Sequence, residues 1–131
     1  MLNGVHTWTA ATHTFRNYLT NAAPVATNTV YGTPADLSTA NGYTAKGPQV
    51  ATATSLVGGT TPGRVIATDP TALTATGAVG PFRYVVLFND TPTSPADPLW
   101  SWWDYGSAVT LANTETFTYD YDGTNGLFDW G

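Results

Sequence analysis

The stretch FRYVVLFN, from Phe82 to Asn89, decides the fold of this chain. Successive side chains of a β-strand point to opposite faces, so the even-numbered residues of this stretch, all aromatic or aliphatic, share one face. The opposite face carries Val85 and Leu87 at its centre. Apolar side chains on both faces of a short segment are typical of a strand that is covered on both sides. We therefore predict a central, buried strand over 82–89.

A second strand signal, TETFTYDY, runs from Thr114 to Tyr121. Phe117, Tyr119 and Tyr121 alternate with threonine and aspartate, which is the period of a half-buried strand. This pattern predicts a strand whose aromatic face points toward the core.

Shorter segments predict further strands, which are separated by turns rich in Gly and Pro. TFRNYLT at 14–20 is a strand candidate, with a short helical turn as the alternative. The other predicted strands are 42–56 (one or two strands), 64–68, 73–78, 99–105 and 108–111, with turns at 58–63, 69–70, 90–98 and 106–107. Strands that are apolar on one face only bury that face most stably when many of them pair in a meander or Greek key. We predict a single all-β domain over 1–131, an antiparallel β-sandwich or jelly roll.

The N-terminal part of the chain departs from this pattern in two segments. Residues 1–14 read as an arm or an edge strand, and residues 21–41 as an irregular loop or arm that is longer than an ordinary loop. An irregular segment buries too little apolar surface to offset its own chain entropy. We expect partners to order part of this extended N-terminal region.

The composition limits the classes of function. Cysteine is absent, which excludes disulfides and thiolate zinc sites. The net charge is -5 and the four basic residues are scattered, so we predict no nucleic-acid partner. The opening MLNGVH lacks the features of a secretion signal, and no apolar stretch approaches the ~20 residues of a membrane span. We expect a protein made in a reducing cytoplasm, with no membrane partner.

Tryptophans form the main candidate site: Trp100, Trp102 and Trp103, with Trp130 near the C-terminus. In a regular strand Trp100 and Trp102 share one face and Trp103 lies on the other. Such side chains can fill a core, make a subunit contact or stack on sugar rings. Because aromatic residues occupy both faces, we predict that one face packs in the core and the other lies in an interface. The candidate interface anchors are Trp100, Trp102, Trp103 and Trp130.

A weaker pattern concerns calcium. Asp120, Asp122 and Thr124 fit the first, third and fifth ligand positions of a calcium loop. The sixth position is Asn125 instead of Gly and the twelfth is Gly131 instead of Glu, and two successive turns account for the pattern without a metal. We predict no metal and no cofactor, and we keep Asp120, Asp122 and Thr124 as a weak calcium candidate.

The sequence offers no catalytic constellation. It has no Gly-x-Ser-x-Gly elbow and no histidine after His13. Paired carboxylates are needed for glycoside chemistry, and nothing in the sequence brings Asp104 and Glu115 together. We predict that the chain is not an enzyme.

Two stretches, GPFRYVVLFNDT at 80–91 and DPLWSWWDYGSAVTLANTETFTYDYDGTNGLF at 97–128, resemble small virion structural proteins of tailed bacteriophages. The shared pattern is a hydrophobic strand, a Pro- or Gly-rich loop, a Leu-x-x-Trp strand, a Val-Thr-Leu strand, a Gly-Glu-Thr-Phe strand and a Gly-Leu-Phe ending. Here Asn113-Thr114 replaces the Gly of the fifth element, and Asn tolerates the left-handed conformation that such a turn uses. The resemblance covers chiefly the C-terminal part of the chain. It implies a β-sandwich built into a virus particle and carries over no catalytic or ligand residue.

From these observations we expect a capsid decoration or cement protein of the virion, assembled in the bacterial host cytoplasm. Its expected partners are the major capsid protein and copies of itself. Such proteins usually sit at capsid joints, which implies a trimer. The alternatives are a tail-tip, tail-fibre or receptor-binding component and a carbohydrate-binding module for a host-surface glycan.

Overall fold

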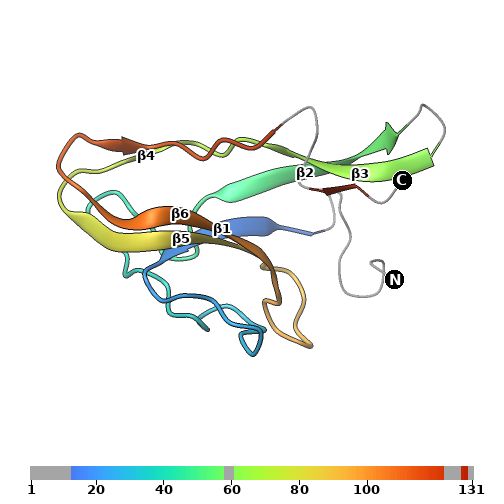
Figure 1. Cartoon of the computed structure of the whole chain (residues 1–131), viewed down its shortest axis with the longest axis horizontal. Helices are drawn as coiled ribbons and strands as arrows, with labels where there is room; N and C mark the ends of the chain where they lie inside the picture. The colour runs from blue at the N-terminus through green and yellow to red at the C-terminus, as the bar shows by residue number, and fades with distance from the viewer. Residues whose placement is uncertain (1–12, 58–60, 123–127, 130–131) are drawn as a thin grey trace.

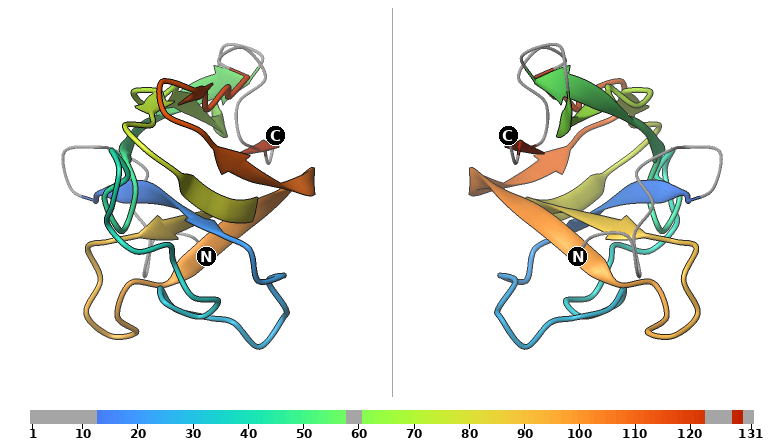
Figure 2. Two further views of the ribbon diagram at one scale, coloured as in Figure 1. Left: turned by 90° about the vertical axis from the view of Figure 1, so that its left-hand side faces the viewer. Right: turned by 90° about the vertical axis from the view of Figure 1, so that its right-hand side faces the viewer.

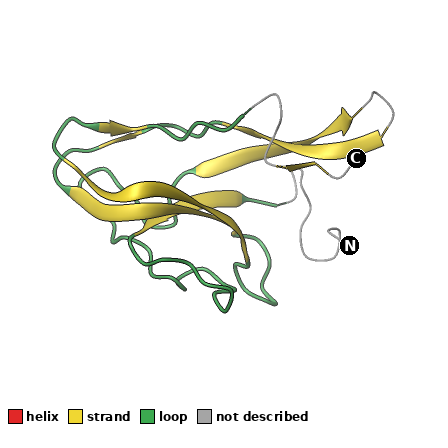
Figure 3. Ribbon diagram, viewed as in Figure 1, coloured by secondary structure: helices red, strands yellow, loops and turns green. Residues whose placement is uncertain are grey.

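The computed structural model describes residues 13–57, 61–122 and 128–129. In this part of the chain all regular structure is β-strand and no helix is present (Figures 1 and 3). The strands are β1 (Phe15–Thr20), β2 (Gln49–Val57), β3 (Thr61–Thr68), β4 (Leu73–Thr74), β5 (Val79–Asn89), β6 (Leu99–Leu111), β7 (Thr116–Phe117) and β8 (Phe128–Asp129).

One antiparallel sheet holds six of these strands in the order β6-β5-β1-β2-β3-β8, and β4 pairs with β7 in a separate ribbon. β1 pairs with β2 only through Phe15↔Val50 and Arg16↔Gln49, so β2 diverges from β1 and the sheet curls into a half-barrel (Figures 1 and 2). The predicted all-β antiparallel fold is confirmed. The predicted sandwich or jelly roll is not confirmed, because β2 and β3 belong to the same curled sheet as β1 and β5 and do not form a second large sheet.

The core lies inside this curl. Phe15 of β1, Val50 of β2, Val65 of β3 and Leu87 of β5 pack in one cluster, and each is at most 1% exposed. Burial of one such side chain stabilises the fold by about 1.5–3 kcal/mol. A second cluster extends the core toward β4 and consists of Leu19, Tyr43, Leu73, Ala75, Val79, Phe82, Leu111 and Tyr119.

Strand β5 is covered on both faces, as its sequence predicts. Leu87 points into the core, while Val86 and Phe88 are equally buried on the opposite face. There the ring of Tyr31 stacks on Phe88, with 4.9 Å between the ring centroids and 24° between the planes.

The irregular segment 21–41 provides this outer cover from within the chain. The Tyr18 hydroxyl donates to the carbonyl of Pro34 at 3.0 Å, and the Leu37 amide donates to the main chain of β1 at 3.0 Å. The segment is therefore held in part by contacts within the chain, to β1 and β5, and its further ordering by partners stays a prediction. Most of the predicted arm, residues 1–12, lies outside the described residues.

The predicted turn at 106–107 is wrong, because β6 runs without a break from residue 99 to residue 111. Gly106 has a φ of 98°, which glycine adopts without steric cost, and its amide donates to Asp104 Oδ1 at 2.7 Å. The glycine is therefore an irregularity inside one long strand and does not end it.

Buried tyrosines make the stability of this fold sensitive to alkali. Burial raises the pKa values of Tyr18, Tyr43, Tyr119 and Tyr121 above the ordinary 10.0, and burial with the hydrogen bond to Asp36 raises the pKa of Tyr31 to about 12. Above pH 10 the unfolded chain therefore releases protons that the folded chain retains, so the free energy of unfolding falls as the pH rises.

We predict cooperative unfolding above pH 10. The absorbance of phenolate should increase over the same pH range in which the circular dichroism signal of the β-sheet disappears. The same titration in denaturant, where every tyrosine is exposed, provides the control. Ionisation of all tyrosines near pH 10 in a protein that stays folded would contradict this account.

Candidate functional site

Strand β6 is an edge of the six-stranded sheet. Only its start is covered within the described residues, where the Leu99 amide donates to the carbonyl of Thr29 at 2.9 Å. The strand is 13 residues long and contains no lysine or proline, the residues that commonly protect an edge from pairing. Most of its side chains are exposed, including Trp102 at 49% and Tyr105 at 60%. A long edge with exposed apolar side chains is a template for pairing with another strand, and the register shifts against β5 divide it into shorter regular stretches.

The tryptophans of β6 do not follow regular alternation. The pairing of β5 with β6 shifts register between Leu87 and Phe88, so that Trp100 packs against the inner cluster of Phe15 and Leu87. Trp102 packs instead edge-to-face on Tyr84, at 5.8 Å between the ring centroids. Trp100 is therefore the bulged residue and packs on the inner cluster, while both tryptophans also line the depression beside Pro24 and Val25.

Trp103 lies on the inner side of the curl and is 37% exposed, in edge-to-face contact with Tyr121. Trp100 thus packs against the core while partly buried, whereas Trp102 and Trp103 reach the surface. Trp130, the fourth predicted interface residue, lies outside the described residues.

A groove of about 210 Å³ separates the inner face of β6 from the segment 117–121. Two edge-to-face ring pairs line it: Trp103 with Tyr121, at 5.4 Å and 66°, and Tyr105 with Phe117, at 5.9 Å and 65°. Tyr119, which is 4% exposed, also lines the groove.

The alternation predicted for 114–121 places Phe117, Tyr119 and Tyr121 on this side of the segment. Only Thr116–Phe117 pairs with another strand, since its partner β4 is itself two residues long. Thr114 lies in a turn with a φ of 72°, and residues 118–121 form no regular strand, so the predicted strand over 114–121 is wrong except at Thr116–Phe117.

Two carboxylates line the same groove, and in the described part of the chain only one of them is paired with a basic side chain. Asp104 accepts two hydrogen bonds from the Arg83 guanidinium, at 2.7 and 2.8 Å, and these lower the pKa of Asp104 to about 2. Its charge is therefore neutralised by Arg83. Asp120 is exposed, and no described residue forms an ion pair or hydrogen bond with its carboxylate.

A second depression, of about 400 Å³, is lined by Trp102 and the loop that contains Pro24 and Val25. Val25 is 57% exposed, so this depression has an apolar rim. Trp102 and Trp103 thus line different depressions, and both depressions border β6.

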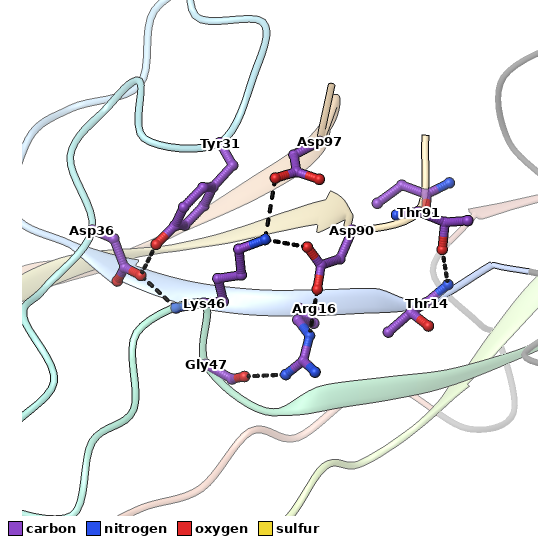
Figure 4. Close-up of polar contacts among 10 residues, drawn as sticks. Thr14, Arg16, Tyr31, Asp36, Lys46, Gly47, Asp90, Thr91 and Asp97 are labelled. Atoms are coloured by element: carbon purple, nitrogen blue, oxygen red, sulfur yellow. Dashed lines mark hydrogen bonds and ion pairs between the residues drawn. The ribbon is translucent and has the colours of Figure 1, made fainter. Parts of the chain in front are cut away.

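Lys46 and Arg16 hold the loops near β1 together (Figure 4). The Lys46 ammonium bonds to Asp90 and also, at 3.2 Å, to Asp97. Arg16 Nε lies 2.9 Å from the other oxygen of Asp90, and Arg16 Nη1 donates to the carbonyl of Gly47 at 3.0 Å. The network joins β1, the loop before β2 and the loop after β5.

This network is suited to structure more than to chemistry. The hydrogen bond to Asp90 raises the pKa of Lys46, so the amine stays protonated at neutral pH and has no free electron pair for nucleophilic attack. Asp36 accepts hydrogen bonds from the Lys46 amide and from the Tyr31 hydroxyl, which fixes the loop further.

The described residues do not assemble a metal centre: no group of three or more His, Asp or Glu side chains in them could hold an ion. Asp120 and Asp122 follow β7, while Thr124 lies outside the described residues, so the weak calcium candidate stays a prediction. Glu115 accepts a hydrogen bond from the Ala112 amide and stabilises the turn before β7. The part of the chain that the structure describes has no helix long and apolar enough to cross a membrane.

Comparison of the chain with protein-family models, with curated protein sequences and with solved structures found no match in any of the three.

Proposed function

We propose that this chain is a structural protein of a tailed-bacteriophage virion, a capsid decoration or cement protein that binds the outer shell and copies of itself through strand β6. The observation that carries this proposal is the edge of β6 from Trp100 to Thr110, which no described strand covers. Sequence resemblance supplies the virion setting, and the edge strand supplies a physical means of assembly.

Pairing along β6 combines two kinds of interaction. A partner strand satisfies the outward amides and carbonyls of the edge, which supplies affinity through main-chain hydrogen bonds. Side chains such as Trp102 are half-exposed and lose water when a partner covers them, which contributes about 25 cal/mol per Å² of apolar area. Exposed tryptophan and tyrosine are the residues that most often dominate binding energy at interfaces.

Local charge allows one β6 to meet another. The chain carries a net charge of -5, yet the ion pair of Arg83 with Asp104 neutralises the only acidic residue of β6. From Gly106 to Leu111 the strand has no charged residue. Two copies can therefore approach along this edge without placing like charges opposite each other. Pairing about a two-fold axis gives a dimer, and pairing with a different edge gives a closed ring such as a trimer.

A decoration protein stabilises the assembled shell by mass action. A protein that binds the assembled shell and not its separated subunits shifts the equilibrium toward the shell. The gain grows with the number of filled sites, so a decoration protein is needed in many copies.

Copy number in purified particles tests the proposal. Quantitative mass spectrometry of phage particles that carry this chain is expected to give hundreds of copies per particle. A value of roughly a dozen or fewer, as for a ring at the tail, would replace the capsid assignment with the tail alternative. Absence of the chain from washed particles would refute the virion proposal altogether.

A further inference from the structure

We propose that the groove between β6 and the segment 117–121 binds a quaternary ammonium group. This site is independent of the assembly role, because edge pairing uses the main chain of β6 and the groove lies on its inner face. The ligand class follows from the walls, the charge and the hydrogen-bonding capacity of the groove.

The walls are faces and edges of aromatic rings. Trp103, Tyr105, Phe117 and Tyr121 all line the groove, and the rings within each contacting pair meet at 65° or 66°. The steep angle within each pair means that its two rings do not form one flat platform. Ring faces carry negative potential, so a groove lined by several rings attracts a cation through cation–π contacts.

The charge of the groove has the matching sign. The Asp120 carboxylate lines it and has no partner among the described residues, while Asp104 is already paired with Arg83. The net charge of -5 adds a weak attraction for cations over a longer range.

Hydrogen-bonding capacity separates the possible ligands. A quaternary ammonium has no N–H donor, so it loses no hydrogen bond when aromatic rings replace its water. A primary ammonium would bring three donors to a groove in which, among the described residues, Asp120 is the one carboxylate without a partner. A sugar would bring many hydroxyl groups and would need a broad flat platform to stack on, which neither ring pair provides. The groove therefore favours a trimethylammonium head over both.

The direct test is titration of the purified protein with choline, followed by tryptophan fluorescence and calorimetry. We expect a dissociation constant of about 1 mM, as a few cation–π contacts allow. Dimethylbutanol, the uncharged carbon analogue of choline, and ethanolamine, the primary amine, are expected to bind at least tenfold more weakly. Equal binding of either analogue would refute the proposal, as would absence of choline binding or tighter binding of a monosaccharide.

Two variants locate the site. Trp103→Ala is expected to weaken choline binding at least tenfold, whereas Trp102→Ala, which changes the other depression of β6, is expected to leave it unchanged. Asp120→Asn removes an exposed carboxylate that has no partner in the described part of the chain, so it should keep the fold and weaken binding several-fold. Equal effects of the two tryptophan variants, or no effect of Asp120→Asn, would contradict the assigned site.

Choline can be met free or as a lipid headgroup, and co-sedimentation with vesicles separates the two sources. Binding to phosphatidylcholine vesicles but not to phosphatidylglycerol vesicles, with loss in Trp103→Ala, identifies a headgroup site. Binding of free choline alone indicates a soluble ligand. Both results retain the quaternary ammonium as the recognised group, and stronger binding to phosphatidylglycerol would refute it.

Discussion

Gly47→Ala is expected to remove most of the stability of this fold. Gly47 has a φ of 64°, and a Cβ atom there would lie 1.6 Å from the main-chain oxygen of Asn17 in β1. Main chain cannot rotate away as a side chain can, so either β1 or the turn before β2 must move. The displacement would also disturb the Arg16 bond to the Gly47 carbonyl and the adjacent Lys46 network.

We expect Gly47→Ala to lower the free energy of unfolding by about 4 kcal/mol or more, against the 5–15 kcal/mol typical of whole domains. Equilibrium unfolding in urea measures this loss. Gly32→Ala is the matched control, because Gly32 also has a positive φ, 85°, but no atom within 4 Å of the added Cβ. In the control, the free energy of unfolding should fall only by about 1–2 kcal/mol, which is what a side chain costs in the left-handed conformation. Equal losses in the two variants would show that the close approach to Asn17 is unimportant.

Ala108→Lys is expected to prevent self-association while leaving the fold intact. Ala108 is exposed on the uncharged part of β6, and an edge lysine is a natural means of keeping strands apart. The added ammonium must lose water or meet its own copy when two edges pair. We expect the dissociation constant of the oligomer to rise at least tenfold, or about 1.4 kcal/mol, in sedimentation velocity over a concentration series.

Ala40→Lys is the control for this experiment. Ala40 is also exposed and its substitution changes the net charge equally, but it lies in the loop before β2 and outside the six-stranded sheet. It should associate as the unmodified protein does. If both variants dissociate to the same extent, general charge is responsible; if neither dissociates, β6 is not the contact.

The all-β class could be predicted because it depends on local patterns, whereas the bounds of β6 and β7 could not. The alternation in 114–121 correctly places its three aromatic residues on one side, and the apolar run at 82–89 correctly predicts a strand that is covered on both faces. These inferences need only the period of a strand and the hydrophobic effect.

The remaining features depend on contacts between distant parts of the chain. The stacking of Tyr31 on Phe88, which converts an irregular segment into a cover, has no local signal. The bulge opposite Leu87 exists only once β6 pairs with β5, so the alternation of Trp100 and Trp102 could not reveal it. The groove likewise required knowledge that the segment 117–121 crosses the inner face of β6.

Amide hydrogen exchange along β6 tests the central claim most directly. In dilute monomer the outward amides between Trp100 and Thr110 have no main-chain acceptor on the edge side among the described residues, and we expect them to exchange quickly. In the assembled protein, and in particles, the same amides should become strongly protected, while Ala108→Lys keeps them in fast exchange. Assembled protein in which these amides exchange as quickly as in the monomer would contradict assembly through β6.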